Sequence, residues 1–287
     1  MLEGIFVEGL IYAIMALGVF FTFRILDFPD LTVDGSFPMG AVIMATTLTG
    51  GLNPLAGLLL AFAGGVSAGF VTAAIHNRLK VPHLLAGILT MTMLYSVNIR
   101  ILDNRANLPL LRVDTVITKV AEFSQGLIPA DWATLAFFMV VVAAIKIGLD
   151  LFFHTDMGLV FGALGNNEQM VKVQGVNPAT LKLIGVGLSN GLVALSGAFA
   201  AGAGATWTFS TGLPAGFSIF SSAIICFSHN LRQFHFFRLL GLMLVLRATI
   251  YLELLQHFSA ELVLRQHPPH RQLDNLFGLL FHHIGKA

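Results

Sequence analysis

SFPMGAVIMATTLTGGLNPLAGLLLAFAGGVSAGFVTAAI, residues 36–75, contains no Asp, Glu, Lys or Arg. The stretches 82–99 and 183–231 share this property. A membrane-spanning helix needs about 20 mostly apolar residues, so the first and last of these stretches can each hold two passes. The whole chain is 56% hydrophobic and 11% charged, whereas a soluble domain carries roughly 25% charged residues. The sequence therefore predicts an all-α, polytopic transmembrane helical bundle.

Eight apolar stretches are predicted to be membrane-spanning helices. They are 5–23, 37–52, 55–75, 84–101, 133–153, 180–204, 216–231 and 239–258. The N-terminal stretch has no Lys or Arg before its apolar run and no small-residue cleavage site after it, so it is interpreted as a retained span and not as a cleaved signal. All 287 residues are expected to form a single transmembrane domain.

Basic residues in short loops predict the orientation of the bundle. The loop HNRLKVPH, 76–83, carries Arg78 and Lys80 and no acid, which is typical of the cytoplasmic side. Alternation along the chain then places 154–179 inside, and 102–132 and 205–215 outside.

The stretch that leads into the first charge-free run is DFPDLTVDGSFPMG, residues 27–40, with three aspartates and two prolines. A water-exposed loop has such a composition, and so does a broken helix buried inside a membrane protein. If 27–52 crosses the membrane fully, Met1 lies on one side. If the segment dips in and returns, Met1 lies on the other, and the charges near the N-terminus do not decide between them.

A second unusual stretch is DMGLVFGALGNNEQMVKVQGVNP, residues 156–178. Asn166 and Asn167 favour a helix start, Glu168 and Lys172 have the spacing of a favourable i,i+4 pair, and Gly175 can end the helix. A short amphipathic helix at the cytoplasmic face is what a soluble partner would bind. The alternative is an interfacial helix that rests on lipid headgroups.

Enzyme motifs are missing from the sequence. It has no GxxxxGK[ST] phosphate-binding loop, HExxH motif or nucleophile elbow. The single cysteine, Cys226, excludes a disulfide framework and a cysteine-based metal cluster. We therefore assign no catalytic residue, no metal site and no cofactor to this chain, and a net charge of +1 does not suggest a nucleic-acid partner.

Four motifs together resemble one family of proteins. LDFPDLTVDGSFPMGA, GILTMTMLYSVNIRI, NLPLL and GLVFGALGNNEQMVKVQGVN are similar to the permease subunits of ABC importers, in the branched-chain amino-acid and ribose permease family. Within it, the branch with tryptophan-type uptake systems is the most similar. The resemblance is strongest over 20–111 and 156–205 and fades from about Ser221. The region 221–287 is atypical, and seven of the ten histidines follow Cys226.

The resemblance implies a set of partners. These are a separate ATPase subunit that binds the ATP, an extracytoplasmic substrate-binding lipoprotein that docks on outer loops such as 102–115, a second permease copy in a homodimer or heterodimer, and membrane lipid. It also implies that 158–177 is a cytoplasmic coupling helix. Similar proteins commonly have Ala-Leu-Arg where this chain has Phe161-Gly162-Ala163. The predicted ATPase-coupling residues are Gly158, Gly162, Gly165, Asn166, Asn167, Glu168, Lys172 and Gly175.

The resemblance, the prolines and the charge-free run together favour a broken or re-entrant second helix on the substrate path. Interrupted helices expose backbone polar groups near the middle of the membrane. Asp27 and Asp30 are expected at the wet end, as helix caps or ion-pair partners of Arg24. The predicted substrate-pathway residues are Asp34, Gly35, Ser36, Thr90, Thr92, Ser96 and Asn98.

Two alternatives stay open for these residues. The polar residues of the fourth span are equally well explained by hydrogen bonds between helices, and Asp34 by a helix cap outside the hydrocarbon. For the chain as a whole, the predicted function is the permease subunit of an ATP-driven importer that moves a small polar solute, an amino acid, across the cytoplasmic membrane. The alternative is a secondary transporter or channel that works alone.

Overall fold

The computed structural model describes residues 2–103, 107–110, 115–123, 130–203 and 206–208. In chain order the helices are α1 (Leu2–Phe20) with its π-helical end η1 (Phe21–Ile25), α2 (Val33–Thr49), α3 (Pro54–Leu79), α4 (His83–Ile101), α5 (Val116–Phe123), α6 (Ala130–Phe153), α7 (Asp156–Asn166), α8 (Glu168–Val173) and α9 (Pro178–Ala203). Two three-residue strands, β1 (Asn107–Pro109) and β2 (Thr206–Thr208), pair antiparallel.

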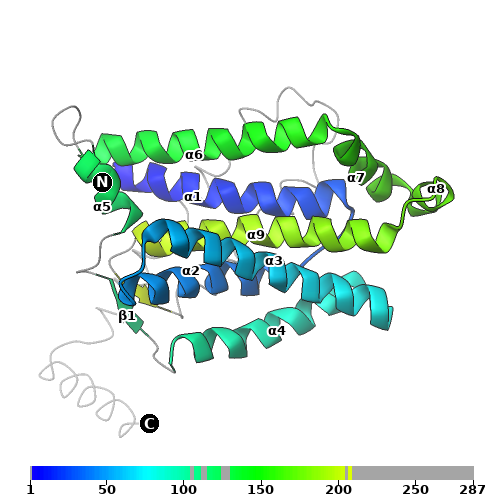
Figure 1. Cartoon of the computed structure of the whole chain (residues 1–287), viewed down its shortest axis with the longest axis horizontal. Coiled ribbons are helices and arrows are strands. Elements are labelled where there is room, and N and C mark those ends of the chain that lie inside the picture. The colour runs from blue at the N-terminus through cyan, green and yellow to red at the C-terminus, as the bar shows by residue number, and fades with distance from the viewer. Residues whose placement is uncertain (1, 104–106, 111–114, 124–129, 204–205, 209–287) are drawn as a thin grey trace, which may run out of the picture.

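The long helices run side by side in one elongated bundle (Figure 1). Five segments of the described residues are long and apolar enough to cross a membrane: Phe6–Ile25, Pro54–Leu79, His83–Ile101, Trp132–Phe153 and Pro178–Ala203. The prediction of an all-α helical membrane bundle is confirmed. The predicted spans 216–231 and 239–258 lie outside the described residues.

Helix α9 is the central element of the bundle, in contact with α1, α2 and α3. Small residues make this close packing possible. A Cβ atom at Gly40 of α2 would clash with the carbonyl oxygen of Ala194, and one at Gly65 of α3 would clash with that of Asn190. In lipid the hydrophobic effect does not bring helices together, so close van der Waals contact of this kind holds them.

The prediction of a broken or re-entrant second helix is wrong, because α2 is one continuous helix and the non-helical stretch lies before it. Residues 26–32, called the break below, are not regular helix, and α2 begins at Val33 instead of near residue 37. Asp34 therefore lies in the first helical turn, where an acidic side chain suits the positive end of the helix dipole. Pro38 lies within α2. It removes one backbone donor without ending the helix.

The segment from η1 through α2 crosses the bundle completely. At one end, Leu26 and Phe28 pack with Phe161 of α7. At the other end, Leu48 packs with Leu102 and Leu110, beyond the C-terminus of α4. The basic loop at 76–83 lies at the first of these ends, where the ring of His76 contacts that of Phe28, and α1 begins at the opposite end of the bundle (Figure 1). This settles the alternative that the sequence left open, in favour of a crossing.

Candidate functional site

Asp30 lies in the break before α2 and is 1% exposed. Its Oδ1 accepts a hydrogen bond from the backbone N–H of Thr32 at 2.8 Å, and its Oδ2 accepts one from Nδ2 of Asn190 at 2.6 Å. The prediction that Asp30 lies at the wet end is wrong, because a hydrogen-bond donor on α9 compensates the burial of the carboxylate. Its predicted role as a local cap is right in part.

Asp27 and Arg24 are both exposed on the bundle, and the wet position of Asp27 stays a prediction. The ion pair predicted between them is not formed. In the part of the chain that the structure describes, the salt bridges are Lys146–Asp150 and Lys182–Glu168. Asp27 has a φ of 52°, a left-handed conformation that Asp and Asn adopt more readily than most residues.

Asn190 connects the flanks of the break. Besides donating to Asp30, its Nδ2 donates to the carbonyl oxygen of Val186 at 3.0 Å, and its Oδ1 accepts from Oγ of Ser36 at 2.8 Å. Sequence reasoning missed this residue. The available signal was the Ser189-Asn190 pair in the middle of a long charge-free stretch, where a polar side chain needs an internal partner.

Helix α3 also contacts the break, through Thr72. Oγ1 of Thr32 and Oγ1 of Thr72 are 2.8 Å apart, and both side chains are fully buried. These contacts form one polar network, called the break network below, which joins α2, α3 and α9 just before and at the start of α2. Its members are Asp30, Thr32, Ser36, Thr72 and Asn190.

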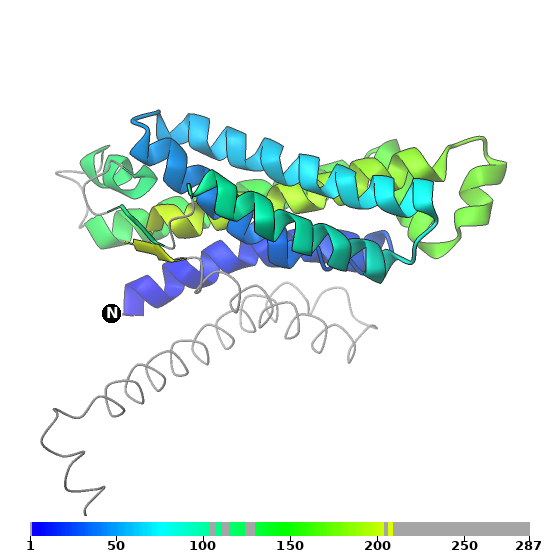
Figure 2. The same ribbon diagram turned by 90° about the horizontal axis from the view of Figure 1, so that it is seen from below.

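A cavity of about 150 Å³ lies between α2 and α4, and it opens to the surface of the bundle beside the exposed Thr92 and Tyr95. Its described lining residues are Asp34, Gly35, Pro38, Met91, Thr92, Tyr95 and Asn98. Asp34 and Asn98 are 2% and 1% exposed. Nδ2 of Asn98 donates to the carbonyl oxygen of Gly35 at 3.3 Å, so the two helices are tied at this point. Figure 2 shows α4 at the surface of the bundle, beside α2 and α3.

The structure brings together four of the seven predicted pathway residues, namely Asp34, Gly35, Thr92 and Asn98, in the lining of this cavity. The other three have different surroundings. Ser36 belongs to the break network, buried Thr90 donates to the carbonyl oxygen of Ala86 at 3.0 Å, and Ser96 is exposed on α4. Sequence reasoning missed the nonpolar and aromatic part of the lining.

The predicted coupling segment forms two helices instead of one. Thr155 caps α7, accepting from the N–H of Gly158 at 3.4 Å, and Asn167 caps α8, accepting from the N–H of Met170 at 3.1 Å. Asn167 is thus a helix start, as predicted. Asn166 is the last residue of α7, so its predicted place at a helix start is wrong.

The glycines of this segment have different surroundings. A Cβ atom at Gly158 would clash with the backbone of Phe152, and one at Gly165 with the carbonyl oxygen of Ile25. Gly162 has open space around it. Gly175 has a φ of 85°, which suits the residue that follows a helix end, as predicted. The absence of a side chain at Gly165 therefore lets α7 pack directly against the end of η1.

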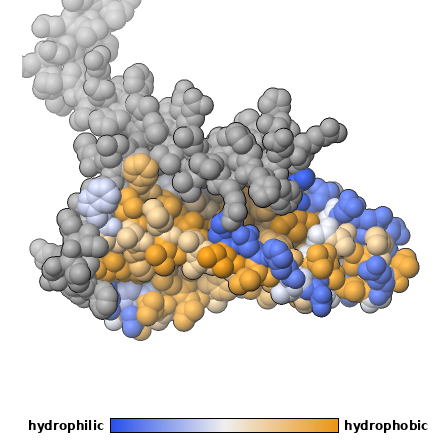
Figure 3. Space-filling view, turned by 90° about the horizontal axis from the view of Figure 1, so that it is seen from above, coloured by the Kyte–Doolittle hydropathy of each residue, from blue (hydrophilic) through white to orange (hydrophobic). Residues whose placement is uncertain are grey.

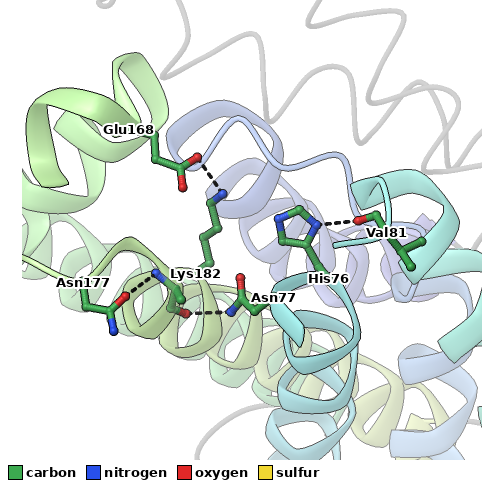
Figure 4. Close-up of polar contacts among 7 residues, drawn as sticks. His76, Asn77, Val81, Glu168, Asn177 and Lys182 are labelled. Carbon is green, nitrogen blue, oxygen red and sulfur yellow. Dashed lines mark hydrogen bonds and ion pairs between the residues drawn. The ribbon is translucent and has the colours of Figure 1, made fainter. Parts of the chain in front are cut away.

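Glu168 forms an ion pair with Lys182 of α9, with Oε2 and Nζ 2.8 Å apart (Figure 4). The predicted pair of Glu168 with Lys172 is wrong. Lys182 is 9% exposed, and a buried ammonium group needs a partner more than the exposed Lys172 does. Helix α8 is therefore tied to the first turns of α9.

The end of α3 is tied to the same turns of α9. Nδ2 of Asn77 donates to the carbonyl oxygen of Ala179 at 2.9 Å, and Oδ1 of Asn177 accepts from the N–H of Ala179 at 3.0 Å (Figure 4). His76 closes the α3–α4 loop, with Nδ1 2.7 Å from the carbonyl oxygen of Val81. Helix α9 thus joins the end of α3 to α8 at the predicted cytoplasmic end.

Exposed residues on α7 and α8 combine apolar and polar character. Leu159, Met170 and Val173 are 64%, 54% and 86% exposed, and Lys172 is also exposed. In Figure 3 hydrophilic residues gather toward the end of the bundle that carries these two helices, beyond the mainly apolar flank. These residues form the surface where the sequence predicts contact with a soluble partner.

Comparison with known proteins gives consistent results. The family model described as "Branched-chain amino acid transport system / permease component" matches residues 1–251. A "Tyrosine transport system permease protein" of Clostridioides difficile (strain R20291) is 42% identical over 198 residues, which cover 69% of this chain and 63% of that protein. An uncharacterized protein of Rickettsia prowazekii (strain Madrid E) is 32% identical over 194 residues, which cover 68% and 65%.

The matched region thus spans less than two thirds of the length of either relative. The family match ends within 221–287, the region that the sequence marks as atypical. No solved structure shows significant similarity to the chain.

Proposed function

This chain belongs to the family of permease components of branched-chain amino acid transport systems, and from that premise we propose that it is the membrane permease of an ABC importer for an amino acid or a related small polar solute. The family match over residues 1–251 carries the proposal. The tyrosine system of the C. difficile relative supports an amino-acid substrate. We place the protein in the cell membrane as a multi-pass protein, with all 287 residues in one permease domain.

The proposal gives this chain no covalent chemistry. ATP is bound and hydrolysed by a separate ATPase subunit, an extracytoplasmic lipoprotein delivers the solute, and a second permease copy completes the pathway. Binding of ATP can shift the permease between two conformations only through the difference in the partner's affinity for them. A shift from 1:99 to 99:1 requires about 5.5 kcal/mol.

The ATPase is proposed to bind at α7 and α8. Three contacts would pass a displacement of these helices to the pathway. Gly165 packs on Ile25 at the end of η1, and Glu168 holds Lys182 at the start of α9. Two helical turns further along α9, Asn190 holds Asp30 in the break before α2. A movement of α7 and α8 would thus be passed to the end of η1 and to the stretch before α2.

Co-expression with a candidate ATPase and binding protein tests the proposal. We expect the three proteins to co-purify. Proteoliposomes that contain them should transport a labelled amino acid only when ATP is present on the side of the membrane that carries the ATPase. Uptake by this chain alone, independent of any ATPase, would contradict the proposal and support a secondary transporter or channel instead.

A further inference from the structure

Among the residues that the structure describes, two buried oxygen atoms of the cavity lining find no hydrogen-bond partner: Oδ1 of Asp34 and Oδ1 of Asn98. Both residues are more than nine-tenths buried, and both line the cavity between α2 and α4. A buried acceptor that lacks a donor costs free energy, and the cost is larger when the acceptor is charged. The two atoms therefore require a donor that the described part of the chain does not supply.

Several donors near these atoms are already in use. Nδ2 of Asn98 donates to the carbonyl oxygen of Gly35 at 3.3 Å, and Oγ1 of Thr92 donates to the carbonyl oxygen of Leu89 at 2.9 Å. Pro38 has no N–H group for the carbonyl of Asp34, four residues earlier. The lining is therefore rich in acceptors.

The described lining also has no positive charge, because none of its residues is Lys, Arg or His. A carboxylate group of a solute would meet the negative charge of Asp34 there without a compensating cation. An ammonium group, in contrast, offers three N–H donors and a positive charge. Hydrogen bonds between ionised partners of this kind are roughly twice as strong as neutral ones.

The remaining lining suits an organic cation. Tyr95 supplies an aromatic ring, and Met91 and Pro38 supply apolar surface. Aromatic rings attract ammonium groups. A cavity needs roughly 10–15 Å³ to hold one water molecule, so the observed volume of about 150 Å³ admits an ammonium group together with the carbon atoms that carry it.

We propose that the cavity between α2 and α4 binds the ammonium group of a primary amine, with Asp34 and Asn98 as its acceptors. Resting on the proposed function, this inference makes the amine a part of the transported solute. It follows that the amino group of the solute, and not its carboxylate, binds between α2 and α4.

A resident metal ion is a weaker explanation for the two oxygen atoms. The described residues contain no group of three or more His, Cys, Asp or Glu side chains that could hold a metal. Calcium takes six to eight oxygen ligands, whereas an ammonium group is satisfied by about three acceptors. The cavity offers the smaller number.

Equilibrium dialysis with the full chain in lipid nanodiscs tests the proposal without an ATPase or a binding protein. The probe is radiolabelled tyramine, which has an ammonium group and no carboxylate. We expect saturable binding at millimolar or lower concentration. Unlabelled 3-(4-hydroxyphenyl)propanoate, which has the carboxylate and no amine, is expected not to compete, and tetramethylammonium, which lacks N–H donors, is expected to compete poorly.

Asp34→Asn keeps the shape of the side chain and removes its charge. We expect it to weaken tyramine binding about 10- to 100-fold, the loss of one hydrogen bond to a charged group. Asp27→Asn is the matched control, since Asp27 is an exposed aspartate in the same stretch, and it should bind like the wild type.

Three results would overturn the proposal: no saturable tyramine binding by the wild type, equal competition by the desamino acid, or wild-type affinity in Asp34→Asn. If Asp34→Asn does not fold, the competition series on the wild type still decides. Because no ATPase takes part, tyramine binding and co-purification with the ATPase can fail independently, so the two proposals are tested separately.

Discussion

Nδ2 of Asn190 lies 2.6 Å from Oδ2 of Asp30, so the central helix α9 is hydrogen-bonded to the non-helical stretch that precedes α2. Asp30 is 160 residues away from Asn190 along the chain. The contact decides how the break is held, and with it the position of Asp34 four residues further on.

Replacing Asn190 with Ala should destabilise the bundle. The change leaves Oδ2 of the buried Asp30 without its donor, at a cost of about 1–3 kcal/mol, while Oδ1 keeps the Thr32 N–H and Oγ of Ser36 keeps the carbonyl of Val33. Thermal unfolding of the purified protein in detergent measures the loss. Ser67→Ala is the control, because that exposed hydroxyl bonds only its own helix. Equal stability of both variants would show that the break network does not hold the break.

Asp30→Asn and Asp34→Asn should have opposite effects on stability. An Asn at position 30 turns an NH₂ group toward the NH₂ group of Asn190, so the unfolding temperature should fall. An Asn at position 34 removes a buried charge whose Oδ1 has no partner, and stability should be unchanged or higher, while ATP-driven uptake falls. A parallel loss of stability in both variants would contradict separate roles for the two aspartates.

Breaking the Glu168–Lys182 pair should uncouple ATP hydrolysis from uptake. With Lys182→Met, we expect an uptake rate about tenfold lower, equivalent to ~1.4 kcal/mol, while the ATPase still co-purifies. The double variant Glu168→Lys with Lys182→Glu should restore part of the uptake, because the pair is reversed and not removed. Lys146→Met is the control, since its pair with Asp150 is exposed on α6. Unchanged coupling in Lys182→Met would contradict the proposed connection between α8 and α9.

Variants at two glycines of α7 test two roles of this helix separately: its packing on η1 and its contact with the ATPase. Gly165→Leu should prevent α7 from seating on Ile25, and we expect lower stability and no uptake. Gly162→Leu adds a side chain in open space, so the protein should stay stable and any loss should appear only in the presence of the ATPase. Measuring unfolding without the ATPase and hydrolysis with it distinguishes the two. Indistinguishable variants would argue against this division.

An exposed apolar residue of α8 should belong to the ATPase contact. Val173 is 86% exposed, whereas Val171, two residues earlier, is 1% exposed. We expect Val173→Glu to keep the unfolding temperature and to lower the amount of ATPase that co-purifies, because it places a charge in the apolar part of the contact. Undiminished co-purification would place the ATPase elsewhere.

Much of the fold was predictable because membrane insertion imposes simple requirements on a sequence. Long runs without charge mark the spans, and the positions of Arg78 and Lys80 mark one end of the bundle. The prolines and aspartates of 27–40 signalled an irregular stretch, but it lies at 26–32, before α2, and not within the second helix. The glycine after α8 and the Asn167 cap were also predictable, since both act on neighbouring residues of the chain.

The errors concern partners that are distant in the sequence. Glu168 has a suitable lysine at Lys172 but pairs with Lys182, because the latter is buried and the former is not. Asp30 was expected in water, and a buried amide on another helix holds it instead. Local spacing does not reveal which side chain loses its water on folding.

By itself, the sequence determined that this chain is a bundle of membrane-spanning helices, and it marked 27–40 and 156–178 as unusual stretches. Hydrophobicity and local backbone preferences act over a few residues, and one sequence contains them in full. Only the tertiary structure decided that 26–49 crosses the bundle, that Asn190 holds the break and that Asp34 and Asn98 share a cavity. Those outcomes depend on which buried polar groups meet across helices, where each unpaired group costs enough free energy to select one arrangement.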